Sequence, residues 1–376
     1  MSIPFVDLKA QFASLEPDIR AGIDQVLEHG QFIMGPEVRA LEAALGQFAQ
    51  VSHVVSCSSG TDALLLPLMA HGVGPGDAVF TTPFTFIATA EVISLLGATP
   101  VFVDIDPRTF NIDPAALAKA VEQTEADGKL KPRGVIAVDL FGLPADYEPI
   151  NTLAERHQLF VIEDAAQSFG ALYHNRRAGA LAHVASTSFF PAKPLGCYGD
   201  GGAVLTEDES LSEAMQSLRV HGKGRDKYDN VRIGMNARLD TLQAAILLPK
   251  LRVLAEEMER RQWVADQYTA RLSDWVTTPM VPDGYRSAWA QYSVLSDQRD
   301  ALQASLKERG VPTAVYYPTP LHLQSAFRDL GYQAGDFPHS ERASKTIVSL
   351  PMHPYMDEAT LTQITNAVVD AVRQAA

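Results

Sequence analysis

The sequence predicts an α/β protein built on a mostly parallel sheet, followed by a smaller α/β domain. Short β-prone runs alternate with helical patterns through the first two thirds of the chain. Several of these runs are apolar on both faces, as expected for parallel strands that are covered by helices on each side. A long helical pattern then leads to a C-terminal part with its own strands and helices. This order of elements is typical of an open α/β sheet with a second domain.

The predicted strands of the sheet are the runs at 53–57, 78–82, 100–104, 135–139, 159–163, 185–190 and 202–206. Helical patterns lie between them at 36–49, 61–71, 86–96, 114–122 and 148–157. Pro67 interrupts the second helical pattern, where an interior proline costs about 3 kcal/mol unless the helix kinks. Ligands of such sheets bind outside the carboxyl ends of the strands, so residues that follow a strand are candidates for function.

The long helical pattern at 238–273 is expected to connect to the second domain. Beyond it, the sequence predicts a strand near 288–295, a helix near 299–309, a strand near 312–317 and a C-terminal helix near 357–374. The polar, turn-rich residues 124–133 predict a surface loop. We therefore expect an N-terminal arm (1–16), a large domain (17–250) and a small C-terminal domain (251–376).

Composition excludes several classes of function. The 376 residues are 46% apolar and 20% charged, which is ordinary for a globular protein. The formal net charge of −14 argues against a surface for nucleic acid or an anionic membrane. Cys57 and Cys197 form neither a metal-type cluster with histidines nor a disulfide scaffold, so we expect no metal. Neither a signal peptide nor a membrane-spanning run is recognisable, and we expect a cytoplasmic protein.

Lys193 lies between a β-prone run and a glycine-dense loop, and Pro191 and Pro194 stiffen the backbone around it. A lysine placed there is presented at a strand end. If it is deprotonated, it suits Schiff-base formation with a carbonyl cofactor such as pyridoxal 5′-phosphate (PLP). Most single lysines are solvated surface residues, so this interpretation depends on the other parts of such a site.

An acid and an amide follow the strand at 159–163. Asp164 is expected at the carboxyl edge of the sheet, where its carboxylate can keep a pyridine nitrogen protonated and so support the chemistry of PLP. Gln167 can donate to the phenolic oxygen of the same ring. The alternative for Asp164 is an ordinary helix N-cap, and without Lys193 the two interpretations are about equally supported.

Two further segments complete the predicted site. Residues 56–63, Ser-Cys-Ser-Ser-Gly-Thr-Asp-Ala, join a strand to a helix, where backbone N–H groups and the helix dipole favour a phosphate. Ser188 can add a hydroxyl to that phosphate, although such turns also cap ordinary helices. Phe86 follows another strand and can stack on the pyridine ring, although an aromatic residue there is more often part of the core.

With these residues the chain resembles the DegT/StrS family of PLP-dependent sugar aminotransferases, of the aspartate aminotransferase (type I) fold. The resemblance spans nearly the whole chain and is strongest in the motifs at 59–63, 84–90, 163–170, 189–196 and 234–245. It implies a large domain with a mostly parallel seven-stranded sheet, a smaller C-terminal α/β domain and a homodimer with shared active sites.

The resemblance also implies residue roles. Lys193 is implied to bond the cofactor and to move the proton, with Asp164 on the ring nitrogen and Gln167 on the ring oxygen. The implied phosphate, stacking and cross-subunit cofactor contacts are Gly60, Thr61, Ser188, Phe86 and Asn236. The implied substrate-binding residues are Arg238, Tyr316, Tyr317 and His322.

Within the family, motifs at 103–111, 193–202 and 237–251 resemble aminotransferases that act on UDP-2-acetamido-2-deoxy-3-oxo-D-glucuronate. The resemblance implies L-glutamate as donor, 2-oxoglutarate as product, and a role in lipopolysaccharide or O-antigen biosynthesis. Arg238 then suits an anionic group of the substrate, although an ion pair explains it equally well. Tyr316 stands where that subgroup has a histidine.

The alternative functions are a C-4 aminotransferase, a sugar dehydratase of the same fold, which Lys193 disfavours, and a non-catalytic PLP- or sugar-binding regulator. The basic loop at 221–230 is either a gate over the pyrophosphate or simply solvated.

Overall fold

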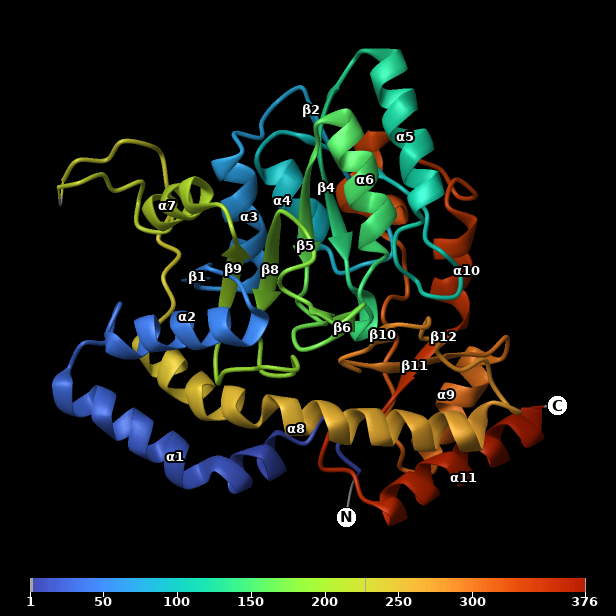
Figure 1. Cartoon of the computed structure of the whole chain (residues 1–376). Coiled ribbons are helices and arrows are strands. Elements are labelled where there is room, and N and C mark those ends of the chain that lie inside the picture. Colours follow the sequence, from blue (N-terminus) through green and yellow to red (C-terminus); the bar gives the residue numbers. More distant parts are fainter. Residues whose placement is uncertain (1–2, 227, 376) are drawn as a thin grey trace.

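A seven-stranded sheet forms the centre of the computed structural model, which describes residues 3–226 and 228–375 (Figure 1). The strand order is β1-β9-β8-β5-β4-β2-β3, and only β9 runs against its neighbours β1 and β8. The strands are β1 His53–Cys57, β2 Asp77–Thr81, β3 Thr99–Phe102, β4 Lys131–Val138, β5 Phe160–Asp164, β8 Val184–Ser188 and β9 Gly202–Thr206. All seven predicted strands are therefore present, and the expectation of a mostly parallel α/β sheet is confirmed.

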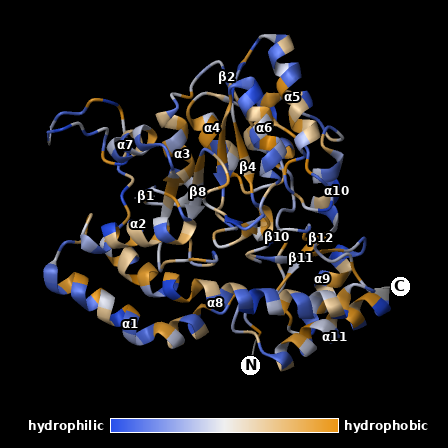
Figure 2. Ribbon diagram, in the orientation of Figure 1, coloured by the Kyte–Doolittle hydropathy of each residue, from blue (hydrophilic) through white to orange (hydrophobic). Residues whose placement is uncertain are grey.

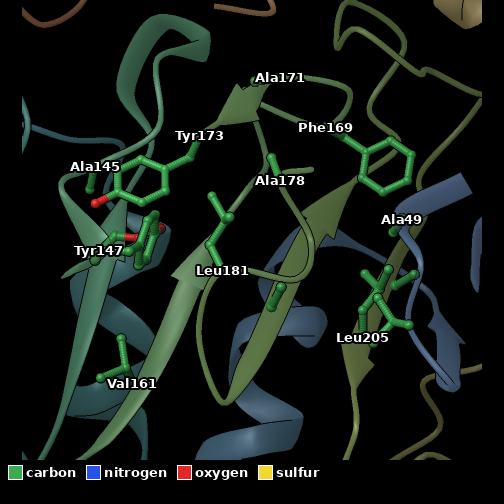
Figure 3. Packing of buried hydrophobic residues seen from close by; sticks show 14 of the residues in the cluster. Ala49, Ala145, Tyr147, Val161, Phe169, Ala171, Tyr173, Ala178, Leu181 and Leu205 are labelled. Atoms are coloured by element: carbon green, nitrogen blue, oxygen red, sulfur yellow. The ribbon is translucent and has the colours of Figure 1, made fainter. Parts of the chain in front are cut away.

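Helices cover both faces of the sheet (Figure 2). They are α2 Pro36–Ala49, α3 Gly60–Ala70, α4 Ala88–Leu95, α5 Pro114–Asp127, α6 Tyr147–His157 and α7 Glu209–Leu218. The first helix, α1 Leu8–His29, packs along α8, Thr241–Leu272, instead of on the sheet. Side chains alternate between the faces along each strand. In β5, Val161 joins the apolar cluster that also contains Tyr147 and Leu181, part of which is drawn in Figure 3, whereas Ile162 joins the cluster on the α3 side. Two separate cores thus hold the sheet and fix the direction of every residue at its carboxyl edge.

Pro67 lies inside α3, where it cannot donate a hydrogen bond to the carbonyl of Ala63. The Ser186 hydroxyl of β8 donates to that carbonyl instead, at 2.6 Å. Since the freed acceptor has a partner from the neighbouring strand, the helix continues through the proline.

The C-terminal elements form a smaller layer on the long helix α8, Thr241–Leu272. They are β11 Tyr292–Leu295, α9 Arg299–Glu308, α10 Pro338–Thr346, β12 Ile347–Leu350 and α11 Glu358–Ala375. A second small sheet joins β6 Leu172–Tyr173, β7 Arg176–Arg177 and β10 Tyr285–Arg286. The 3-10 helices are η1 Leu140–Gly142, η2 Leu321–Leu323 and η3 Ser325–Leu330. This smaller layer confirms the expected C-terminal α/β unit.

Two predictions about these elements are wrong. Residues 312–317 form no strand, because only Ala314 bridges to Ser349, and the chain then turns to pack Tyr317 against Phe84. The partner of β11 is β12, which was not predicted from the sequence.

The predicted surface loop at 124–133 is also much shorter in the structure. Helix α5 continues to Asp127 and ends at Gly128, whose φ of 63° is left-handed, and β4 begins at Lys131.

The predicted domain boundaries fall inside helices. Helix α1 starts at Leu8 and runs through residue 16, and α8 runs without interruption through residue 250. Helix α1 packs along α8 through Leu15, Ile19 and Ile246. Of the helices that the structure describes, none is long and apolar enough to cross a membrane.

Candidate active site

Lys193 follows β8 in a tight loop, and its backbone N–H donates to the carbonyl of Phe190 at 2.8 Å. The side chain is half-buried, so Lys193 is not the solvated loop lysine of the alternative interpretation. Burial lowers the pKa of its ammonium group, and the carboxylate of Asp164 opposes that effect. The site therefore favours a neutral, nucleophilic amine more than water does.

Asp164 is the last residue of β5 and is only 5% exposed. Its Oδ2 accepts a hydrogen bond from the Thr89 hydroxyl at 2.9 Å, and its Oδ1 accepts from the Ala166 N–H at 3.2 Å. Burial raises the pKa of this carboxyl, while these donors and the Lys193 ammonium lower it. Residues 165–170 form turns and no helix, so Asp164 is not a helix N-cap. Its place suits a buried acid that stabilises a cation.

Gln167 is held from two sides. Its Oε1 accepts from the Phe141 N–H at 2.7 Å, and its Nε2 donates to the Tyr317 hydroxyl at 3.3 Å. Tyr317 is thereby brought to the site, and burial raises the pKa of its phenol. Tyr316 packs edge-on against Phe5 of the N-terminal segment, with ring centroids 6.4 Å apart.

The predicted phosphate turn lies at the N-terminus of α3, next to the end of β8. The Ser59 hydroxyl accepts from the Asp62 N–H at 3.0 Å and so caps the helix. A Cβ on Gly60 would lie 2.6 Å from the Cβ of Ser188, so only glycine allows the turn to approach that strand. The structure therefore brings Gly60, Thr61 and Ser188 together where helical N–H groups lack partners within the helix.

Phe86 precedes α4 and is 55% exposed, which excludes the interpretation as a core aromatic. Its ring lies 6.5 Å from that of Tyr317. An exposed ring beside the Gln167–Tyr317 pair is available to cover a planar ligand.

Asn236 and Arg238 lie on the segment before α8. The Arg238 guanidinium donates to Asn236 Oδ1 at 2.6 Å, and the carbonyl of Ala237 between them accepts from the Ser58 N–H at 3.2 Å. This segment thus lies against the phosphate turn of its own chain. Within the described residues, no hydrogen bond or ion pair joins either side chain to Lys193. The basic loop at 221–230 includes residue 227, which lies outside the described residues, and Lys223 bridges to Asn230 within it.

His322 has a different environment. It is 2% exposed, lies 3.2 Å from Glu341 through Nε2, and packs edge-on against Phe337. Burial lowers the pKa of the imidazole. Its described partners are therefore residues of the C-terminal layer, and a direct contact with substrate stays a prediction.

Several polar residues around the site were not predicted from the sequence. Thr89, which is hydrogen-bonded to Thr85 at 3.1 Å, donates to Asp164, and the spacing of four residues between the two threonines on a helical pattern was an available signal. Asp139 follows β4 and is fully buried, and it accepts from the hydroxyls of Ser168 at 2.6 Å and Tyr147 at 2.7 Å. This second acid anchors the turn that carries Gln167.

These residues fit PLP. They supply an amine with a lowered pKa, a buried acid, an amide donor and a glycine turn at a helix N-terminus, all at the carboxyl edge of one sheet. The fold and site together define the class of PLP-dependent aminotransferases of the aspartate aminotransferase type.

The chain belongs to the DegT/DnrJ/EryC1/StrS aminotransferase family, whose model matches residues 13–369. It is 49% identical over 98% of its length to the whole of a Pseudomonas aeruginosa UDP-2-acetamido-2-deoxy-3-oxo-D-glucuronate aminotransferase. It is 45% identical over 99% of both chains to a pleiotropic regulatory protein of Geobacillus stearothermophilus.

Solved structures agree. A family aminotransferase from Brucella abortus superposes with a TM-score of 0.95 at 51% identity, covering 97% of this chain and 98% of that one. NtdA of Bacillus subtilis, solved with its cofactor PMP, superposes with a TM-score of 0.88 at 28% identity, covering 99% of this chain and 86% of that one. The protein is thus a PLP-dependent nucleotide-sugar aminotransferase.

Proposed function

We propose that this aminotransferase moves the amino group of L-glutamate to the C-3 ketone of UDP-2-acetamido-2-deoxy-3-oxo-D-glucuronate. The observation that carries this proposal is the 49% identity, end to end, with a relative named for that substrate. We include in the proposal a homodimer with shared active sites, a cytoplasmic location and a role in lipopolysaccharide or O-antigen biosynthesis.

In this proposal Lys193 has two tasks. Its neutral Nζ would hold the aldehyde carbon of the cofactor, and the same nitrogen, when free, would hold and move a proton at the substrate carbon. The lowered pKa of Lys193 supports both tasks, since a permanently charged ammonium can do neither. When bound, PLP supplies the electron sink that stabilises negative charge at that carbon.

The other residues bind and orient. Asp164 holds a proton on the ring nitrogen, and Thr89 in turn orients the Asp164 carboxylate through the bond to Oδ2. Gln167 donates to the ring oxygen from a position fixed by Phe141. Phe86 stacks on the ring. The burial and hydrogen bonds of Asp164 and Gln167 support their roles, and the exposure of the Phe86 ring supports stacking.

The remaining proposed roles concern the phosphate of the cofactor and the sugar substrate with its carboxylate. Gly60, Thr61 and Ser188 hold the phosphate, and Asn236 reaches the phosphate of the partner subunit. The Arg238 guanidinium, one of whose nitrogens is buried without a partner among the described residues, is proposed to bind the glucuronate carboxylate. Tyr316, Tyr317 and His322 complete the proposed sugar-binding residues.

The direct test is incubation of the purified, PLP-loaded enzyme with L-glutamate and the UDP-3-keto-glucuronate, using the matching 4-keto-sugar and a neutral 3-keto-sugar as controls. We expect a 3-amino product by NMR from the first substrate, together with one equivalent of 2-oxoglutarate. A 4-amino product would replace the proposed regiochemistry, and a dehydrated sugar would identify a dehydratase. Lys193→Ala should abolish product formation with every substrate.

A second candidate follows from the relative named as a pleiotropic regulatory protein. A non-catalytic regulator would bind PLP or the sugar nucleotide and would keep its biological activity after Lys193→Ala. The lowered pKa of the Lys193 amine favours the enzyme, because binding alone does not need a nucleophile.

A further inference from the structure

Lys250 of α8 is a buried lysine near the site. It is only 1% exposed, and its Nζ donates to the carbonyl of Gly196 at 2.7 Å. The same nitrogen lies 4.0 Å from the centre of the Tyr198 ring. Both partners belong to the loop at 189–199 that carries Lys193. Figure 1 shows α8 running below the sheet, past the end of β8 from which this loop starts.

Hydrogen bonds also join the two arms of this loop. Cys197 donates to the carbonyl of Phe189 through its backbone N–H at 2.8 Å and through Sγ at 3.0 Å. A Cβ on Gly196 would lie 2.4 Å from the carbonyl oxygen of Pro191, so the two arms of the loop touch there. A shift of the Gly196 peptide is therefore passed directly to the turn that presents Lys193.

Only two side chains of α8 hold this loop from outside by hydrogen bonds, as far as the described chain shows. Gln243 accepts from the Tyr198 N–H at 3.0 Å, and Lys250 donates to Gly196. Burying an ammonium group has a large desolvation cost unless it is paired, and an apolar side chain would fill the same space without that cost. Burial accordingly lowers the pKa of Lys250 to about 8, against the charge of Glu257 two turns further on. Packing alone does not explain a lysine at this position.

We infer that Lys250 is a positioning residue of the transamination reaction, which fixes Gly196 and Tyr198 so that the loop directs the Lys193 amine toward Asp164. The inference rests on the role proposed above for Lys193. Lys250 itself lies below the loop and acts through it. The charge of Lys250 is not needed at the reacting atoms, since Asp164 is the charged group that acts on Lys193.

Helix α8 also provides a matched control. Arg261 lies eleven residues after Lys250, on the same face of the helix, and is 4% exposed. Its guanidinium donates to the carbonyl of Trp289 at 3.0 Å, in the C-terminal part of the chain. Lys250→Met and Arg261→Met both remove a buried cation with one carbonyl partner, but only the first releases the loop of Lys193.

The experiment compares wild type, Lys250→Met and Arg261→Met as apoproteins to which PLP is added, well below the melting temperature of each. The rate at which borohydride-trapped cofactor mass accumulates on the peptide of Lys193 is measured. We expect Lys250→Met to be at least about tenfold slower, because small misplacements of a reacting group reduce rates by up to about 10²-fold. Arg261→Met should match wild type.

A second readout needs no cofactor. Trace acetylation of the apoproteins, followed by mass spectrometry, gives the reactivity of Lys193 relative to the exposed Lys307. We expect this ratio to change in Lys250→Met and to stay constant in Arg261→Met. If Lys250→Met does not fold, Tyr198→Leu, at a half-exposed position, removes the ring contact and should give the same change in a smaller degree.

The outcomes separate the two proposals. If wild type gains no mass at Lys193, the proposed role of that lysine fails, and mass on Lys250 instead would make Lys250 the nucleophile. If wild type is trapped at Lys193 and the Lys250 and Tyr198 variants react like Arg261→Met in both assays, the role of Lys193 stands and the positioning role of Lys250 is overturned.

Discussion

Glu163 and Asp164 are neighbours on β5, but their buried carboxylates lie on opposite faces of the strand and have different partners. Glu163, fully buried, accepts from the N–H groups of Gly179 at 2.6 Å and Leu181 at 2.9 Å. It belongs to the face packed by Tyr147 and Leu181, which Figure 3 shows in detail. Asp164 points to the opposite face, toward Thr89 and the amine of Lys193.

The two buried carboxyls differ in the groups that surround them. Burial raises the pKa of both carboxyls, so burial alone does not distinguish them. Each oxygen of Glu163 is occupied by a backbone donor from one loop, which makes the carboxylate an anchor. Asp164 also accepts from two donors, the Thr89 hydroxyl and the Ala166 N–H, but it interacts with the amine of Lys193. The neighbouring amine, and not the number of donors, makes Asp164 the candidate for an acid that faces a cationic ligand.

The largest effect is expected from removing the amine on the Asp164 face. Lys193→Ala should reduce turnover by about 10⁴-fold, the upper end of the effect of a single proton-transfer group. Steady-state kinetics with glutamate and the keto-sugar measure this, with thermal melting to show that the fold persists. Residual turnover within tenfold of wild type would remove Lys193 from the mechanism.

Exchanging the two acids for their amides tests the comparison directly. Asp164→Asn should reduce turnover by about 10²- to 10³-fold, as for the loss of one electrostatic stabiliser, with little change in unfolding. Glu163→Gln should instead lower stability and leave turnover unchanged. Its amide opposes one backbone N–H, so the free energy of unfolding should fall by about 1–3 kcal/mol while turnover is kept. Denaturant titrations and kinetics on both variants decide whether the two faces differ in this way.

A smaller effect is expected from Thr89→Val, which removes the hydroxyl that donates to Asp164 at 2.9 Å. Turnover should fall by about tenfold, equivalent to a hydrogen bond of about 1.5 kcal/mol to a charged group. Thr85→Val is the control, since the Thr85 hydroxyl reaches only Thr89, at 3.1 Å, among the described groups. Equal losses in both variants would mean that packing, and not the bond to Asp164, is responsible.

The last effect, on stability alone, concerns Asp139, a second buried acid on the Glu163 side. Burial raises the pKa of its carboxyl from 3.8 to about 7. Between these two values the folded protein holds a proton that the unfolded chain has released, so this group makes stability fall as pH rises from about 4 to about 7. In Asp139→Asn this position cannot titrate, so the free energy of unfolding should fall less between pH 5 and pH 8 than in wild type. Urea unfolding at the two pH values measures this change, and an equal change in variant and wild type would contradict the assignment.

Much of the site was predictable because its residues follow strands. Asp164 and Ser188 end β5 and β8, and Gly60 starts α3, so the pattern of strands and helices placed them at one edge before any contact was known. The missing strand β12 could not be predicted, since its three apolar residues and one serine directly follow helix α10 and gain their partners from β11 and Ala314, which are distant in the chain. The bond between Ser186 and Ala63 that supports Pro67 joins residues far apart in the chain.

The sequence by itself determined the order of strands and helices, the lysine, the acid and the family, because these depend on local pattern and on short motifs. The tertiary structure decided the surroundings of the two adjacent carboxylates, with Glu163 held by backbone donors and Asp164 near the amine of Lys193, and it brought Lys250 to the loop of Lys193. Both depend on long-range contacts and burial, which set hydrogen bonding and pKa. Such contacts are made only when distant segments pack together.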